Sequence, residues 1–172
     1  MSDLPKKILI ATDGSPDARV AARRAADMSR AFGSELHVVH VAPVVEPYHL
    51  FVFPEETDGP SLYEEDLRHA RELLDDEVGK IRVAGGEVAK EYLEEGEPDA
   101  EVVGLAERIG ADLIVAGGRG TGTLRRPIGS VSSSIAAHAH CPVLIVRSEP
   151  VGLSQGGARD GGSSAAMASR EA

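Results

Sequence analysis

Aromatic residues are scarce in this chain of 172 residues. Tryptophan is absent and aromatic residues make up 3% of the sequence, although hydrophobic residues as a whole make up 42%. A core with so few large rings has to be built from valine, isoleucine, leucine and alanine, which is typical of parallel β-sheets covered by helices on both faces. The composition therefore favours an α/β fold.

Cysteine occurs once, at Cys141, so no disulfide can form within the chain and we expect a cytoplasmic protein. No apolar run approaches the roughly 18 residues of a membrane-spanning helix, and residues 1–7 lack the apolar stretch of a signal peptide. The formal net charge of −10 would repel the phosphates of nucleic acids and anionic membranes. We therefore expect no nucleic-acid partner and no membrane association.

Short apolar runs alternate with segments of helical periodicity along residues 1–150, which we interpret as one domain. The pattern predicts strands at residues 8–11, 36–41, 88–93, 113–116 and 142–146. It predicts helices at residues 16–32, 62–83 and 130–138, and a further helix that starts in the turn at residues 96–99 and runs to residue 109. This alternation predicts a doubly wound, five-stranded parallel sheet with helices on both faces, a Rossmann-like fold. Residues 151–172 are rich in Gly, Ser and Ala without apolar periodicity, and are predicted to form a disordered tail.

Turn residues and glycines gather where predicted strands end, and ligands of such sheets bind beyond the carboxyl ends of the strands. Thr12-Asp13-Gly14-Ser15 follows the first strand, and the glycine-rich stretch AGGRGTGTLRRPIGS covers residues 116–130 after the fourth. Glycines let backbone amides approach a phosphate closely. Gly129 and Ser130 open a helix whose first amides and positive dipole end attract anions. We expect nearby arginines to neutralise phosphates, namely Arg119, Arg125 and Arg126.

The glycine pattern alone leaves two interpretations open, because tight strand-to-helix turns also collect glycine. The stretch is not a Walker A loop, since no lysine precedes Ser130, and G-x-G-x-x-G does not follow the first strand. His37 and His40 fall on opposite faces of one predicted strand and are interpreted as packing residues.

Several separate motifs resemble the universal stress protein family, over about residues 5–147. They are ILIATDGS at residues 8–15, LHVVHV at 36–41, ADLIVAG at 111–117, GSVS at 129–132 and HCPVLIVR at 140–147. The resemblance implies a fold of the adenine nucleotide alpha hydrolase-like type and a homodimer joined through the strand at 142–146. In one branch of the family it also implies an ATP site with the pattern G-x2-G-x9-G-[ST].

The resemblance assigns nucleotide contacts position by position. Asp13 would face the ribose, the backbone of Val41 the adenine, and the amide and hydroxyl groups of Val131 and Ser132 the phosphates. This chain has eight residues between Gly120 and Gly129 where the family pattern has nine, and Pro127 is among them. The implied nucleotide-binding residues are Ala11, Thr12, Asp13, Val41, Gly117, Gly118, Arg119, Gly120, Gly129, Ser130, Val131 and Ser132.

The expected ligand is ATP, or AMP or ADP, with Mg²⁺ on the phosphates and no metal site formed by the protein itself. Phosphoryl transfer needs a positioned base and cations across the phosphates, and Asp13 is the one obvious acidic group nearby. We therefore expect a stress-response regulator that binds nucleotide with slow or no hydrolysis and has no catalytic residues. Two alternatives stay open: a dimeric stress protein that binds no nucleotide, and an ATP-dependent enzyme of related fold.

Overall fold

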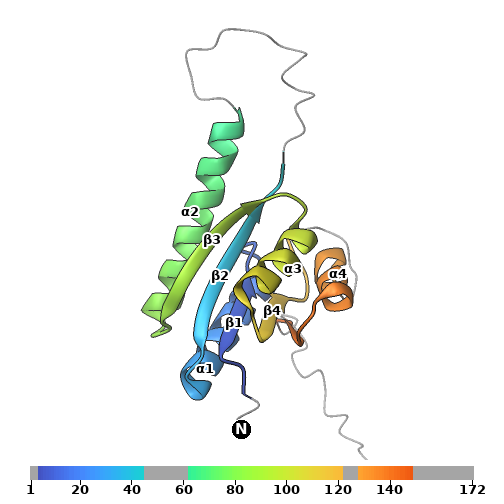
Figure 1. Cartoon of the computed structure of the whole chain (residues 1–172). Helices are drawn as coiled ribbons and strands as arrows, with labels where there is room; N and C mark the ends of the chain where they lie inside the picture. Colours follow the sequence, from blue (N-terminus) through green and yellow to red (C-terminus); the bar gives the residue numbers. More distant parts are fainter. Residues whose placement is uncertain (1–3, 45–61, 122–127, 149–172) are drawn as a thin grey trace, which may run out of the picture.

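Five strands and four helices alternate in the computed structural model, which describes residues 4–44, 62–121 and 128–148 (Figure 1). In chain order they are β1 (Lys7–Ala11), α1 (Pro16–Phe32), β2 (Glu35–Ala42), α2 (Leu62–Val83), β3 (Val88–Glu95), α3 (Pro98–Ile109), β4 (Leu113–Gly117), α4 (Ser130–His138) and β5 (Val143–Val146). Every expected element is present. The largest differences in length are at β3, which ends two residues later than predicted, and at β2, which is one residue longer at each end.

The sheet is parallel throughout, with the strand order β3-β2-β1-β4-β5. The chain therefore adds β2 and β3 on one side of β1 and then returns to add β4 and β5 on the other side. This confirms the predicted doubly wound α/β fold, and it places the reversal of strand order between β1 and β4.

Side chains alternate across the sheet and form one hydrophobic cluster on each face. Ile8 and Ile10 of β1 pack with α1 and α2, whereas Leu9 between them packs with α3 and α4. Both faces of β1 are fully buried, because all three side chains have no exposed surface. In Figure 1, α2 and α3 accordingly lie on either side of the strands.

Local sequence signals account for the ends of α1. The Ser15 hydroxyl accepts a hydrogen bond from the Ala18 N–H at 3.2 Å, and Pro16 follows as the first helical residue. Gly33 ends the helix at φ 69°, a left-handed conformation that glycine adopts without strain. The helix therefore begins and ends where the sequence predicts.

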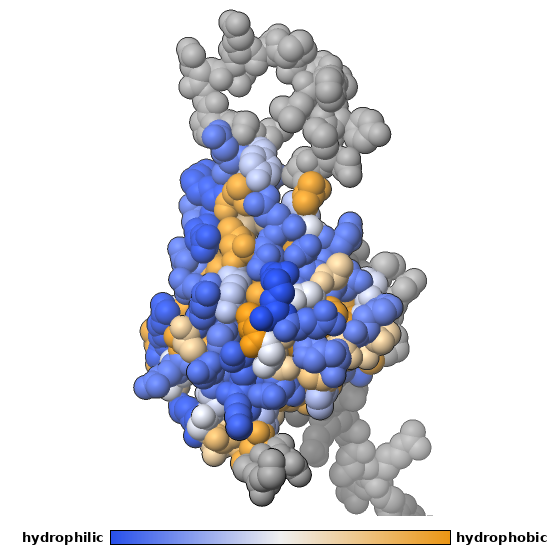
Figure 2. All heavy atoms as spheres, viewed as in Figure 1, coloured by the Kyte–Doolittle hydropathy of each residue, from blue (hydrophilic) through white to orange (hydrophobic). Residues whose placement is uncertain are grey.

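The face shown in Figure 2 is mostly hydrophilic, with hydrophobic residues in small groups between charged ones. No helix in the described ranges is long and apolar enough to cross a membrane. The predicted tail at residues 151–172 and the residues Arg125, Arg126 and Pro127 lie outside the described residues.

The end of β4 approaches the start of α1 so closely that only glycine fits. An ideal Cβ placed on Gly117 would lie 2.6 Å from the backbone nitrogen of Ala18 and 2.9 Å from the carbonyl carbon of Asp17. Both neighbours are backbone atoms of a helix and cannot rotate away. Gly117 therefore fixes how near α1 lies to the carboxyl end of the sheet.

Replacing Gly117 by alanine is expected to lower the free energy of unfolding by about 1–3 kcal/mol, because α1 has to shift outward. Gly79, inside α2, provides a matched control, since nothing lies within 4 Å of a Cβ placed there. Gly79→Ala is expected to raise the free energy of unfolding by up to about 1 kcal/mol. Urea unfolding followed by circular dichroism measures both changes, and a Gly117→Ala protein as stable as the wild type would show that α1 is free to move.

Candidate functional site

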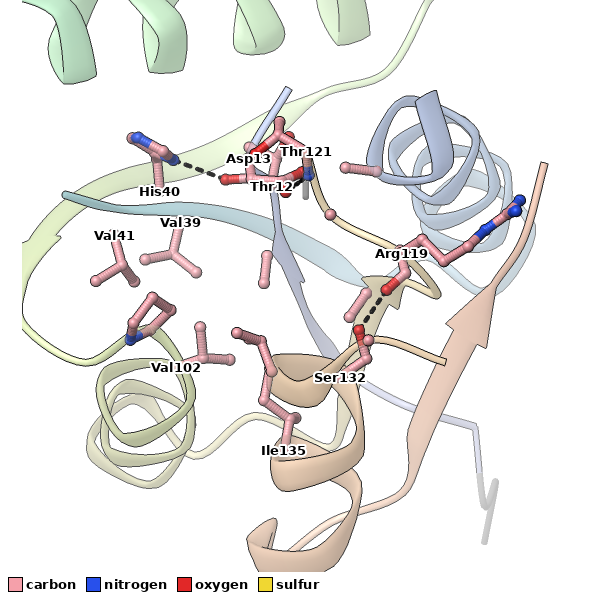
Figure 3. A pocket seen from close by; sticks show the side chains of 18 of the residues that line it. Thr12, Asp13, Val39, His40, Val41, Val102, Arg119, Thr121, Ser132 and Ile135 are labelled. Atoms are coloured by element: carbon pink, nitrogen blue, oxygen red, sulfur yellow. Dashed lines mark hydrogen bonds between the residues drawn. The ribbon is translucent and has the colours of Figure 1, made fainter. Parts of the chain in front are cut away.

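A cavity of about 490 Å³ opens at the carboxyl ends of β1, β2 and β4 (Figure 3). Eleven of the twelve implied nucleotide-binding residues line it: Ala11, Thr12, Asp13, Val41, Gly117, Arg119, Gly120, Gly129, Ser130, Val131 and Ser132. They come from three strand ends, the glycine-rich segment and the start of α4. Segments more than a hundred residues apart in the sequence thus meet around one cavity.

Gly118 is the exception, because it is not among the residues lining the cavity. Its N–H donates to the Val146 carbonyl and its own carbonyl accepts from the Gly129 N–H, both at 2.7 Å. An ideal Cβ there would lie 2.6 Å from the Cγ atom of Arg147. Gly118 therefore joins β4 to the end of β5 and to the start of α4, and contributes to the site only by holding its wall in place.

The reversal of strand order leaves backbone groups of β2 without a strand partner. The last hydrogen bond between β1 and β2 runs from the Thr12 N–H to the Val39 carbonyl at 2.9 Å. The Thr12 carbonyl then accepts from His40 Nδ1 at 2.8 Å, where a longer β1 would have paired with the Val41 N–H. Among the described residues, the N–H and C=O of Val41 have no hydrogen-bond partner on this side, at the edge of the cavity.

Apolar side chains form the part of the cavity next to Val41. Val39 and Val41 come from β2, Val102 from α3 and Ile135 from α4, and Figure 3 shows them around the same space. Val39, Val102 and Ile135 are each at most 2% exposed. The arrangement provides an apolar slot for a flat, poorly hydrated group, with backbone donors and acceptors along one edge.

Asp13 uses both carboxylate oxygens to fix the turns around it. Oδ1 accepts from the Ser15 N–H at 3.0 Å, and Oδ2 accepts from the Thr121 N–H at 3.2 Å. A Cβ on Gly120 would lie 2.8 Å from Oδ2, so a larger residue at position 120 would displace this carboxylate. An ionised carboxylate offers about four acceptor positions. Asp13 therefore keeps capacity to accept hydrogen bonds from a ligand.

The start of α4 supplies unpaired N–H groups. Gly129 is the N-cap and no side chain caps the helix, so the first amides, those of Ser130, Val131 and Ser132, have no partner in the helix. The Ser132 hydroxyl donates to the Gly117 carbonyl at 2.6 Å, so it holds α4 against β4. The Ser130 hydroxyl, by contrast, forms no hydrogen bond within the described part of the chain, so it is free to bind a ligand in the cavity.

Arg119 lines the cavity with its backbone, while its guanidinium is bound elsewhere. Nε and Nη2 donate to the two carboxylate oxygens of Asp17, at 3.1 and 3.3 Å. In Figure 3 the side chain accordingly extends away from Val39, Val41 and Val102. Because the carboxylate of Asp17 already pairs with this guanidinium, neutralisation of phosphates by Arg119 stays a prediction.

Asp17 is 2% exposed and binds Arg119 and Ser148 together. The Ser148 N–H donates to Asp17 Oδ1 at 3.0 Å, and the Ser148 hydroxyl donates to the same oxygen. Burial alone would raise the pKa of Asp17, but the hydrogen bonds from Arg119 and Ser148 lower it to about 2. The carboxylate is therefore ionised at neutral pH.

Nine residues of the cavity are not among the implied nucleotide contacts: Ala18, Val39, His40, Pro43, Pro98, Val102, Ala116, Thr121 and Ile135. Ala116 and Thr121 belong to the glycine-rich stretch at residues 116–130, whereas the others lie outside it. His40, which we interpreted as a packing residue, lies beside Thr12 at the edge of the cavity. Alternation along β2 could have identified Val39, which shares a face with Val41. Pro98 and Val102 carry no local signal, because α3 reaches the cavity only through its packing against the sheet.

No group of three or more metal-ligating side chains occurs within residues 4–44, 62–121 and 128–148. Among the described residues that line the cavity, Asp13 is the one carboxylate. The cavity thus combines an apolar slot, a carboxylate and a helix N-terminus, and its chemistry suits a ligand with a base at one end and an anionic group at the other.

Sequence comparison and structure comparison point to the same family. The sequence profile of the Universal stress protein family matches residues 5–147. A universal stress protein of Methanocaldococcus jannaschii is 36% identical to this chain over 146 residues, which cover 84% of each sequence. Among solved structures, UspA from Lactobacillus plantarum has the same fold, with a TM-score of 0.69 at 23% identity over 83% of this chain and 97% of its own.

A second solved structure contains a ligand. The universal stress protein from Archaeoglobus fulgidus in complex with dAMP has a TM-score of 0.60 at 28% identity, over 83% of this chain and 98% of its own.

The low pKa of Asp17 predicts how stability depends on pH. Its pKa falls from 3.8 to about 2 on folding, so its contribution to stability is complete only above about pH 5 and is lost progressively as the pH falls toward 2. Over that interval the wild type is expected to lose about 2 kcal/mol more unfolding free energy than Asp17→Asn. Urea unfolding at several acidic pH values tests this, with the exposed Asp27→Asn as control. Equal pH dependence in the wild type and Asp17→Asn would contradict it.

Proposed function

The chain belongs to the universal stress protein family, and we propose that it is a stress-response regulator that binds an adenine nucleotide in the cavity at β1, β2 and β4. One observation carries the proposal: unpaired backbone groups lie at both ends of the cavity, at Val41 and at the start of α4. The dAMP complex of the Archaeoglobus fulgidus relative supports it.

The adenine ring fits the apolar slot between Val39, Val102 and Ile135. Its N6 amine would donate to the Val41 carbonyl while its N1 accepts from the Val41 N–H. This pairing satisfies two backbone groups that the strand reversal leaves open, and buried polar groups without partners are costly. Adenine binding therefore completes the hydrogen bonding of β2 where β1 has ended.

The remaining polar groups of the cavity would bind the ribose and the phosphates. Asp13 lies between the slot and the glycine-rich segment, where its carboxylate can accept from the ribose hydroxyls. The amides of Ser130, Val131 and Ser132 and the free hydroxyl of Ser130 would bind the phosphate oxygens at the positive end of α4. We propose that ATP binds in this way with Mg²⁺ on its phosphates, and that AMP and ADP occupy the same site.

We expect slow or no hydrolysis. A catalytic base would have to orient the attacking water, and the one carboxylate among the described cavity residues, Asp13, already accepts two backbone hydrogen bonds. The Arg119 guanidinium is held by Asp17 and is not available to stabilise a transition state. Nucleotide occupancy would then act as a signal within a cytoplasmic regulator.

A homodimer is the second part of the proposal. β5 is an edge strand, and its side chains are all half-buried in the single chain. An apolar edge left unpaired is an aggregation hazard, and antiparallel pairing of two copies across a two-fold axis would remove it. We therefore propose that two copies join through the predicted interface at residues 142–146.

Placing a negative charge at Ser130 tests the phosphate end of the site. Ser130→Asp is expected to weaken ATP binding at least about tenfold and adenosine binding less than about twofold, because the charge repels phosphates only. Ser133→Asp is the matched control: it adds the same charge to the same helix, outside the cavity, and should leave both affinities nearly unchanged. Isothermal titration calorimetry measures the affinities.

The same proteins separate the three candidate functions. Chromatography of the nucleotides after incubation with ATP should show bound nucleotide and little product. Rapid multiple turnover would favour the ATP-dependent enzyme. A wild type that binds neither AMP nor ATP at millimolar concentration would favour the dimeric protein without nucleotide.

The geometry of β5 provides a test of the dimer. The Pro142 carbonyl accepts from the Ile114 N–H and the Val146 carbonyl from the Gly118 N–H, so these residues of the strand direct their backbone groups toward β4. Backbone groups alternate in direction along a strand, and Ile145 therefore directs its N–H and C=O to the open edge. Ile145→Pro removes an edge donor without removing a hydrogen bond to β4. It is expected to weaken dimerisation at least about tenfold, whereas Ile145→Val should not. Sedimentation equilibrium measures this, and a monomeric wild type, or a folded Ile145→Pro protein that dimerises normally, would contradict the interface.

A further inference from the structure

Asp17 joins two parts of the chain that are far apart in sequence. Arg119 lies 102 positions away in the wall of the cavity, and Ser148 lies 131 positions away, two residues after the end of β5. Both donate to the same carboxylate, and Oδ1 accepts from Arg119 Nη2 as well as from Ser148. The cavity wall and the exit of the edge strand thus share one buried group.

These two partners cannot act independently. A buried carboxylate is stable only while donors surround it, so displacing one partner increases the dependence on the other. Burial raises the pKa of Asp17 and both partners lower it, which shows that each of them stabilises the charge. A movement of Arg119 therefore changes the hydrogen bonding of Ser148 to Asp17, and a movement of Ser148 changes that of Arg119.

Arg119 is itself tied to the groups proposed to hold nucleotide. Its carbonyl accepts from the Ser15 hydroxyl at 3.1 Å. Of the next two residues, Gly120 packs against the Asp13 carboxylate, and the Thr121 N–H donates to it. A ligand that contacts Asp13 and the glycine-rich wall would restrict the Arg119 backbone and, through it, the guanidinium on Asp17.

We propose that Asp17 is a positioning residue that couples occupancy of the cavity to the end of β5, through Arg119 on one side and Ser148 on the other. The inference rests on the proposed function, since it takes an adenine nucleotide as the occupant. Coupling of this kind is reciprocal. Nucleotide binding strengthens pairing of the edge strand, and pairing of that strand raises nucleotide affinity by the same factor.

A mutant cycle on AMP affinity tests the coupling. Ser148 does not line the cavity, yet Ser148→Ala is expected to weaken AMP binding about threefold to tenfold when Asp17 is present. In the Asp17→Asn background the same change should have less than about a 1.5-fold effect. Ser34→Ala is the control, because it also removes a serine hydrogen bond, the one to the Pro5 carbonyl at the other end of the sheet.

Hydrogen exchange adds a measurement that a purely structural role would not change. AMP should slow exchange of the amides of Val146, Arg147 and Ser148 in the wild type and should not do so in Asp17→Asn. Equal effects of Ser148→Ala in both backgrounds, or equal protection of these amides in both proteins, would overturn the coupling.

Unfolding without ligand separates failure of the coupling from failure of nucleotide binding. Arg119→Ala and Ser148→Ala should be non-additive in urea unfolding when Asp17 is present and additive in Asp17→Asn. If the wild type binds no AMP but the two substitutions are non-additive only when Asp17 is present, the proposed ligand is wrong and the coupling of Arg119 to Ser148 through Asp17 is real. Additive effects of the two substitutions when Asp17 is present would overturn the coupling of Arg119 to Ser148.

Discussion

Parallel pairing around β1 is the constraint on which the rest of the structure depends. β1 is buried on both faces and lies between β2 and β4, and the chain leaves β1 and β4 toward helices on opposite faces of the sheet. Neither strand can continue past this point, so β2 extends beyond its neighbour with the backbone of Val41 unpaired on that side. The cavity is a direct result of the strand order, and the side chains around it only shape what fits there.

Polar side chains around the cavity bind mainly to the protein itself. Ser132 holds α4 to the Gly117 carbonyl, Asp13 fixes two turns, and Arg119 is bound by Asp17. These contacts order the wall, and they leave backbone N–H groups as the main donors to a ligand. Such donors are held by the fold, so they lose little conformational entropy on binding.

Features of the fold that depend on neighbouring residues were predictable from the sequence. Ser15 and Pro16 begin α1 where expected, and glycines mark the wall of the cavity, because caps and tight turns are decided by a few adjacent residues. The role of Arg119 was not predictable, since its partner Asp17 lies 102 positions away. Val102 was missed for a related reason: a valine on a helix looks the same whether it packs against the sheet or lines a cavity.

The unpaired backbone of Val41 also bears on how such a site can change over evolutionary time. Main-chain donors and acceptors are the same for every residue except proline. Many amino acids could therefore replace Val41 while the same two groups remain in place, provided that the new side chain fits the slot. Sequence drift at this position can thus be large while the ligand stays the same, and two relatives that share the strand order can share a ligand without sharing the residue that contacts it.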